Sequence, residues 1–232
     1  MKYWIQTFSR VAWDLQAPNP KNIYLEDIAT SLAHQGRFCG HTKRFYSIAQ
    51  HSVLVSHHCD YPREGLMHDG TETYVGDVSR PLKLLLGLGT FYSAVNAVTS
   101  AEKRRVICSW VNGNSKTRAD RADSLAAARL FAAYDQIEGA HWVAIAKRFK
   151  LSSSEKVVAA VKVADTRMLC TEAHDLLKGG PLPGFISIDG VERYPFKIKP
   201  WSPERSKKEF LHRFKKVMIY LTHHDLPRII KA

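Results

Sequence analysis

Apolar residues recur every three or four positions along several stretches of this chain, which is the spacing of one face of an α-helix. The stretches are Ile48–His57, Ser124–Phe149, Glu155–Leu177 and Pro203–Leu221. Alternating patterns typical of strands are few by comparison. The sequence therefore predicts an all-α fold, in which helices bury their apolar faces against one another.

One segment near the C-terminus departs from the helical pattern. The glycines and proline of 179–181 are typical of a helix end, and Ser202 followed by proline is typical of a helix start. Between them, short alternating stretches flank Asp189 and Gly190, a pair that favours a tight hairpin turn. We expect a small C-terminal β-hairpin there.

The length and the apolar content indicate one compact domain, 1–232. A chain of 232 residues with 45% apolar residues can bury a core without disulfide bonds. The cysteines are far apart and form no metal-binding or redox pair, so we expect free thiols in a reducing compartment. The sequence shows no signal peptide and no apolar run long enough for a membrane, so we expect a cytoplasmic protein. The cysteines are Cys39, Cys59, Cys108 and Cys170.

The charge favours an anionic partner. The formal net charge is +12 and the pI is about 9.6, which suits a nucleic acid, a polyphosphate ligand or simply solvent. Acidic residues nevertheless gather within 60–77. An acidic island in a basic protein is typical of a cation site that faces an anionic substrate, although ordinary surface variation gives the same pattern.

Two polar residues fall on predicted buried faces. Asp165 shares a helical face with Val161, Met168 and Glu172, and His51 lies on the inner side of its helix. A buried carboxylate costs several kcal/mol unless it is paired or bound to a metal, so Asp165 requires a positive partner. The partner could be a metal or an arginine, and a single inward histidine could equally be only hydrogen-bonded.

The block 65–77 supplies the metal chemistry. His68 and Asp69 are adjacent, Glu72 follows on the same side of a helix, and Asp77 lies five residues further on. Two imidazoles and two carboxylates form a mixed nitrogen and oxygen set that suits Zn, Mn, Fe or Co and leaves positions for water and a phosphate. An additional carboxylate can accept the proton of an attacking water.

These motifs resemble the HD-domain phosphohydrolases, in particular the small bacterial and phage branch with 5'-deoxynucleotidases and phage dATP triphosphohydrolases. The resemblance covers roughly half to two-thirds of the chain. It lies in RFCGHTKRFYSIAQHS, LMHDGTETYVGDVSRPLK, VKVADTRMLCTEAHDLL and WSPERSKKEFLHRF.

The resemblance implies an HD-domain helical bundle and a role for each matching residue. It makes His51, His68, Asp69 and Asp165 the ligands of a divalent metal, which could be Zn, Mn, Co, Fe or Mg. It makes Glu72 and Asp77 the catalytic carboxylates. It places Arg37 and Lys83 on a substrate phosphate and Phe38 on the base, although the two cations could be surface charges and the phenylalanine a core residue.

The sequence departs from the pattern of that branch at about 86–133, where some 45 residues intervene before the next matching helix. This predicted insertion carries several Lys and Arg residues, and it could cover the active site, extend the phosphate contacts, form an oligomer contact or be a solvated appendage. We expect a homo-oligomer.

The resemblance implies a hydrolase of deoxynucleotide metabolism. The expected reaction converts a deoxynucleoside mono- or triphosphate to the deoxynucleoside plus phosphate or triphosphate, with adenine nucleotides favoured. A phosphodiesterase acting on cyclic or oligonucleotides is the alternative enzyme. A non-catalytic module that binds nucleic acid is less favoured, because a structural metal site needs no additional carboxylates.

Overall fold

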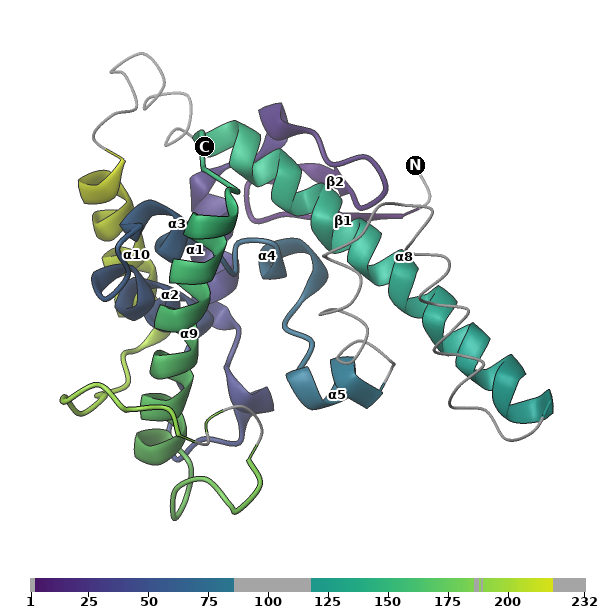
Figure 1. Cartoon of the computed structure of the whole chain (residues 1–232). Coiled ribbons are helices and arrows are strands. Elements are labelled where there is room, and N and C mark those ends of the chain that lie inside the picture. The colour runs from purple at the N-terminus through teal and green to yellow at the C-terminus, as the bar shows by residue number, and fades with distance from the viewer. Residues whose placement is uncertain (1–2, 86–117, 186–187, 189, 219–232) are drawn as a thin grey trace. The chain divides into compact units, whose positions relative to one another are not determined.

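The computed structural model describes residues 3–85, 118–185, 188 and 190–218. Its elements are mainly helical and are shown in Figure 1. They are β1 (Trp4–Gln6), β2 (Ala12–Asp14), η1 (Pro20–Asn22), α1 (Leu25–His34), η2 (Phe38–Gly40), α2 (Ile48–His57), α3 (Pro62–Met67), α4 (Glu72–Val75), α5 (Arg80–Leu85), α8 (Arg118–Phe149), α9 (Glu155–Leu176) and α10 (Pro203–Val217).

The chain divides into two compact units. The first unit comprises 1–77 and 140–232, and the second comprises 78–139. The second unit includes the predicted insertion at about 86–133, most of which lies outside the described residues. Helix α8 contributes its first residues to the second unit and 140–149 to the first.

The first unit is a bundle in which α2 contacts α1, α3, α9 and α10. Helix α2 begins with a capped turn, because the Ser47 side chain accepts a hydrogen bond from the Gln50 N–H at 3.1 Å. Ile48 and Val53 pack into one buried cluster with α1 and α10, while Val55 packs into a second cluster with α9. The helix thus lies between two apolar layers, and its polar side chains are held in fixed positions.

The predicted helices are largely confirmed. Helix α2 has the predicted bounds, α9 ends one residue early, and α10 begins at Pro203 behind the Ser202 cap. Gly179 and Gly180 both have positive φ values after α9, which glycine adopts without a steric penalty. The predicted end of that helix is therefore correct.

The small sheet that the structure describes lies near the N-terminus. Strands β1 and β2 pair antiparallel, with Ile5 opposite Trp13. Trp13 is buried, stacks on Tyr74 at 4.1 Å and donates a hydrogen bond from Nε1 to Nε2 of His141 at 2.9 Å. In the predicted C-terminal hairpin, 186, 187 and 189 lie outside the described residues, and the described residues from 182 to 201 form no strand.

No helix among the described residues is both long enough and apolar enough to cross a membrane.

Candidate metal centre

Four polar side chains from three parts of the first unit converge on one point. His51 comes from the middle of α2, His68 and Asp69 directly follow α3, and Asp165 comes from the middle of α9. The Nε2 atom of His51 lies 3.3 Å from Nε2 of His68, 3.5 Å from Asp69 Oδ2 and 3.3 Å from Asp165 Oδ1. The Nε2 atom of His68 lies 3.2 Å from Asp69 Oδ1 and 3.9 Å from Asp165 Oδ1. The structure therefore brings together all four residues that the sequence predicted as ligands.

In both imidazoles, the hydrogen bond at Nδ1 fixes the direction in which Nε2 points. His68 Nδ1 lies 3.0 Å from the Gly65 carbonyl oxygen, which can only accept, so this nitrogen carries the hydrogen. His51 Nδ1 lies 2.6 Å from Oε1 of Glu172, a carboxylate oxygen that also accepts. In the neutral rings both Nε2 lone pairs consequently point into the same space.

The convergent groups suit a metal ion. Ligand atoms of His51, His68 and Asp69 all lie within 4.8 Å of one another, so this cluster could hold a metal ion. Asp165 adds a second carboxylate beside it. Lone pairs and carboxylates that face one another repel unless a cation lies among them. The mixture of nitrogen and oxygen ligands suits a divalent metal that is intermediate between hard and soft, such as zinc.

The pKa values of the acidic and basic groups respond to this crowding. Burial and the Arg37 charge oppose protonation of His51, but Glu172 and the hydrogen bond with Asp165 outweigh them and raise the pKa of His51 to about 9. Burial lowers the pKa of His68. Burial opposes ionisation of Asp165, yet its contacts with His51 and the charges of His68 and Lys162 hold its pKa well below the ordinary value. The carboxylate therefore stays ionised and available to a cation.

Behind His51 lies a buried hydrogen-bond network centred on Glu172. The carboxylate is fully buried, and its Oε1 accepts from the Tyr46 hydroxyl at 2.8 Å as well as from His51. Its Oε2 accepts from Nε of Arg37 at 3.1 Å. Burial opposes ionisation of Glu172, but Arg37 and His51 outweigh it and lower the pKa of this carboxyl. Glu172 is thus a buried anion with three donors.

The chain brings Arg37 to this network by a short backbone pairing. The Arg37 N–H donates to the Tyr46 carbonyl at 2.9 Å, and Gly36 and Ser47 form an antiparallel bridge. Arg37 Nη1 also reaches Asp69 Oδ2 at 3.4 Å, so one guanidinium joins two carboxylates of the site. The sequence predicted Arg37 as a phosphate contact. That role stays a prediction, and its guanidinium already has these two partners.

Phe38, predicted to contact the base, follows Arg37 at an unusual turn. Phe38 and Cys39 have φ values of 56° and 51°, a region that residues other than glycine seldom adopt and that often marks a functional site. The Phe38 ring lies 6.4 Å from the ring of Phe185 and packs against a small buried cluster. Its proposed contact with a base stays a prediction.

The His-Asp block is a tight turn where the sequence suggested a continuous helix. Helix α3 ends at Met67 and α4 begins at Glu72. The N–H of Gly70 donates to the Met67 carbonyl at 2.9 Å, and that of Glu72 donates to the Asp69 carbonyl at 3.0 Å. A Cβ atom on Gly70 would lie 2.9 Å from the Met67 oxygen, closer than such atoms normally approach. The glycine therefore permits the turn that presents His68 and Asp69.

The two predicted catalytic carboxylates lie close to this turn in sequence. Glu72 is the first residue of α4, and Asp77 follows Gly76, whose φ of 77° ends that helix. Both are partly buried residues of the first unit. Lys83, the third predicted substrate contact, belongs to the second unit, where Nζ pairs with Glu138 Oε1 at 3.3 Å.

Sequence reasoning missed three residues of the site: Glu172, Tyr46 and Lys162. Glu172 lies on the same face of its helix as Asp165, so its position in an apolar stripe was the available signal. Lys162 pairs with Asp165 at 2.8 Å as an exposed neighbour three residues away. Nothing in the sequence distinguished Tyr46 from other core tyrosines.

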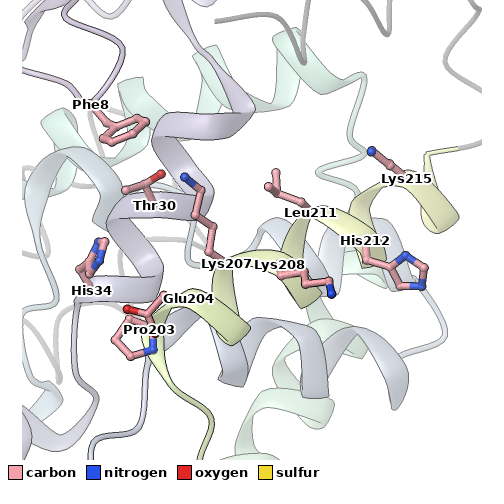
Figure 2. Close-up of a pocket in the computed structure, with 10 residues that line it drawn as sticks. All are labelled: Phe8, Thr30, His34, Pro203, Glu204, Lys207, Lys208, Leu211, His212 and Lys215. Atoms are coloured by element: carbon pink, nitrogen blue, oxygen red, sulfur yellow. The ribbon is translucent and has the colours of Figure 1, made fainter.

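A separate groove of about 570 Å³ lies between α1 and α10. Figure 2 shows Lys207, Lys208 and Lys215 along it, with Phe8 and Thr30 on the opposite side. None of its lining residues belongs to the predicted site.

Comparisons with known proteins give partial matches. The chain is 45% identical to uncharacterized protein YfdR of Escherichia coli K12 over 84 residues, which are 35% of this chain and 47% of that protein. It is 35% identical to uncharacterized protein RCAP_rcc00048 of Rhodobacter capsulatus over 97 residues, 37% of this chain and 50% of that protein. The chain thus spans about half the length of the curated relatives that it matches. No model of a protein family matches the chain.

Proposed function

We propose that this protein is a metal-dependent phosphohydrolase of deoxynucleotides. The reaction converts a deoxynucleoside mono- or triphosphate to the deoxynucleoside plus phosphate or triphosphate, with adenine nucleotides as the favoured substrates. One observation carries the proposal: two imidazole Nε2 atoms face each other at 3.3 Å, with two carboxylates beside them. Such a set is typical of a catalytic divalent-metal site.

The site is open on one side, as a hydrolytic centre requires. His51 is fully buried, whereas the side chains of His68, Asp69 and Asp165 are 14%, 17% and 19% exposed. In this proposal, water and a phosphate approach the ligands from the side of these three residues. A divalent ion held there supplies a Lewis acid that lowers the pKa of water and neutralises phosphate charge.

The chain's own groups supply the remaining chemistry in this proposal. Glu72 begins its helix three residues after Asp69, and it accepts the proton of the attacking water. Asp77 assists at the leaving oxygen or contacts the sugar. Arg37 offers positive charge to the substrate phosphates, and Phe38 offers a ring to the base.

Product analysis tests the proposal directly. The protein is incubated with each deoxy- and ribonucleoside mono- and triphosphate in Mn²⁺, Co²⁺, Mg²⁺ or Zn²⁺, and the products are separated by chromatography. Release of a deoxynucleoside with phosphate or triphosphate supports the proposal. Cleavage confined to cyclic or oligonucleotides would assign a phosphodiesterase, and metal-independent turnover would contradict a metal mechanism.

Two variants separate metal binding from the proton transfer. His68→Ala removes a ligand and is expected to abolish both metal binding and turnover. Glu72→Gln keeps the ligand set, so we expect it to bind metal normally and to lose about 10²–10⁴-fold in rate, the usual contribution of a general base. If both variants lost metal affinity equally, Glu72 would not act as the proposed general base alone.

A further inference from the structure

Glu172 differs from the predicted ligands because it reaches the metal centre only through other residues. It follows Asp165 by seven residues, so α9 places both carboxylates on one face, two turns apart. Asp165 meets the Nε2 side of His51, whereas Glu172 meets the Nδ1 side at 2.6 Å. A single helix therefore holds the His51 ring from both edges.

We propose that Glu172 is a positioning residue that orients His51 as a metal ligand. Through Arg37, it also fixes the position of the Asp69 carboxylate relative to His51. This inference rests on the metal site of the proposed function. It assigns Glu172 no contact with substrate or water, since the carboxylate is fully buried.

The geometry of the hydrogen bonds supports the orienting role. A carboxylate that accepts from Nδ1 fixes the tautomer of the imidazole, so the Nε2 lone pair stays directed at the metal, and such partners also strengthen the ligand. Tyr46 donates to the same Oε1 at 2.8 Å. This second donor prevents the carboxylate from turning away from His51.

Arg37 extends the effect to a second ligand. Its Nε lies 3.1 Å from Glu172 Oε2 and its Nη1 lies 3.4 Å from Asp69 Oδ2. The guanidinium is planar and rigid, so fixing one edge on Glu172 also fixes the edge that meets Asp69. Glu172 thus constrains one nitrogen ligand directly and one oxygen ligand through a rigid link.

Charge balance favours the same role. Ion pairs at the centre join Asp69, Asp165 and Glu172 to Arg37 and Lys162. Replacing Glu172 by glutamine removes one negative charge from this set. A less negative centre attracts a divalent cation less strongly, so the loss of this charge should weaken metal binding even without movement.

The competing explanation is that Glu172 only holds the fold together. In that case the Arg37–Glu172 pair would anchor the segment before α2 to α9, and its loss would lower stability without changing the metal. Metal affinity and metal spectroscopy of the folded protein distinguish the two explanations, because a purely structural anchor changes neither.

The test uses Glu172→Gln in the full chain, with Glu64→Gln as the matched control. Glu64 is also a buried carboxylate, 7% exposed, and it accepts a hydrogen bond from the Ser152 N–H at 3.0 Å. Co²⁺ and Mn²⁺ are titrated by calorimetry, and the visible absorption of the Co²⁺ form is recorded. We expect Glu172→Gln to lose about 10–100-fold in affinity for both ions and to change the Co²⁺ spectrum, while Glu64→Gln leaves both unchanged.

Tyr46→Phe keeps the test decisive if Glu172→Gln does not fold. It removes one donor to Oε1 and leaves all charges in place, so we expect a smaller loss of affinity, about threefold, with a shifted Co²⁺ spectrum. The inference would be overturned if folded Glu172→Gln kept the wild-type metal affinity and Co²⁺ spectrum, whatever the change in melting temperature. If only Tyr46→Phe folds, the same result in that variant would overturn it. If the wild type binds Co²⁺ through His68 but hydrolyses no nucleotide, the proposed function fails while the role of Glu172 is still tested by affinity.

Discussion

The two halves of the candidate metal centre are built differently. The deep side, formed by His51, Tyr46 and Glu172, is fully buried, and its polar atoms bond to one another. The open side, formed by His68, Asp69 and Asp165, is partly exposed and rests on a tight turn and one helix face. The difference suggests a comparison of stability with binding: the deep side is part of the buried core, whereas the open side carries three of the four predicted metal ligands.

Removing each histidine in turn should give the largest contrast. His51→Ala leaves Glu172 buried without its shortest hydrogen bond, which should cost about 3 kcal/mol of unfolding free energy. His68→Ala removes a partly exposed ring whose outer partner is a backbone carbonyl, so we expect a loss of about 1 kcal/mol. Urea unfolding of the metal-free proteins measures both values, and equal losses would contradict the division into a deep and an open side.

Metal addition should stabilise the protein only when the open side is intact. A metal at a hundred times its dissociation constant adds about 2.7 kcal/mol to the unfolding free energy of a protein that binds it only when folded. Asp165→Asn should remove this increment, and it should also lower the metal-free stability, because the folded protein favours the ionised Asp165 carboxylate. Thermal unfolding with Mn²⁺ and with EDTA gives both quantities. An increment that survives in Asp165→Asn would place the metal elsewhere.

The turn at Gly70, which carries His68 and Asp69, should be destabilised by any side chain at that glycine. In Gly70→Ala, the new Cβ would lie 2.9 Å from the Met67 oxygen and 3.4 Å from Ile145, so we expect a loss of about 1–2 kcal/mol and weaker metal binding. Gly139→Ala is the control, because that glycine lies within α8 with nothing within 4 Å of its added Cβ. It should gain up to about 1 kcal/mol. A neutral Gly70→Ala would mean that the turn readily adjusts.

The sequence predicted the open side better than the deep side, for a physical reason. Asp165 can be recognised from the sequence because it is a carboxylate in an otherwise apolar helix face. His68 and Asp69 can be recognised because two residues of metal-binding types are neighbours in the chain. Glu172 shows the same local signal, but its partners Tyr46 and Arg37 are 126 and 135 residues away in the chain. A single sequence carries no information on which distant donors meet a buried anion.

The errors in the fold have similar causes. The His-Asp block was expected to be one helix because its spacing is helical, whereas backbone crowding at Gly70 produces a turn that spacing does not reveal. The observed strands have three residues each, too few for an alternating pattern to be recognised. The predicted hairpin around Asp189 and Gly190 lies partly outside the described residues and stays a prediction.

The smallest expected effect concerns the charge beside the open side. Lys162 is 59% exposed and lies 2.8 Å from Asp165 Oδ2. Exposed pairs of this kind contribute at most about 1 kcal/mol, so Lys162→Met should change stability by less than about 0.5 kcal/mol. The lysine does compete with a cation for Asp165, and its removal should tighten Mn²⁺ binding about two- to fivefold. Lys208→Met, an exposed lysine at the α10 groove, removes the same charge away from the predicted ligands and should leave affinity unchanged. Weaker binding in Lys162→Met would show instead that the lysine holds Asp165 in place, and the open side would then share the fixed geometry of the deep side.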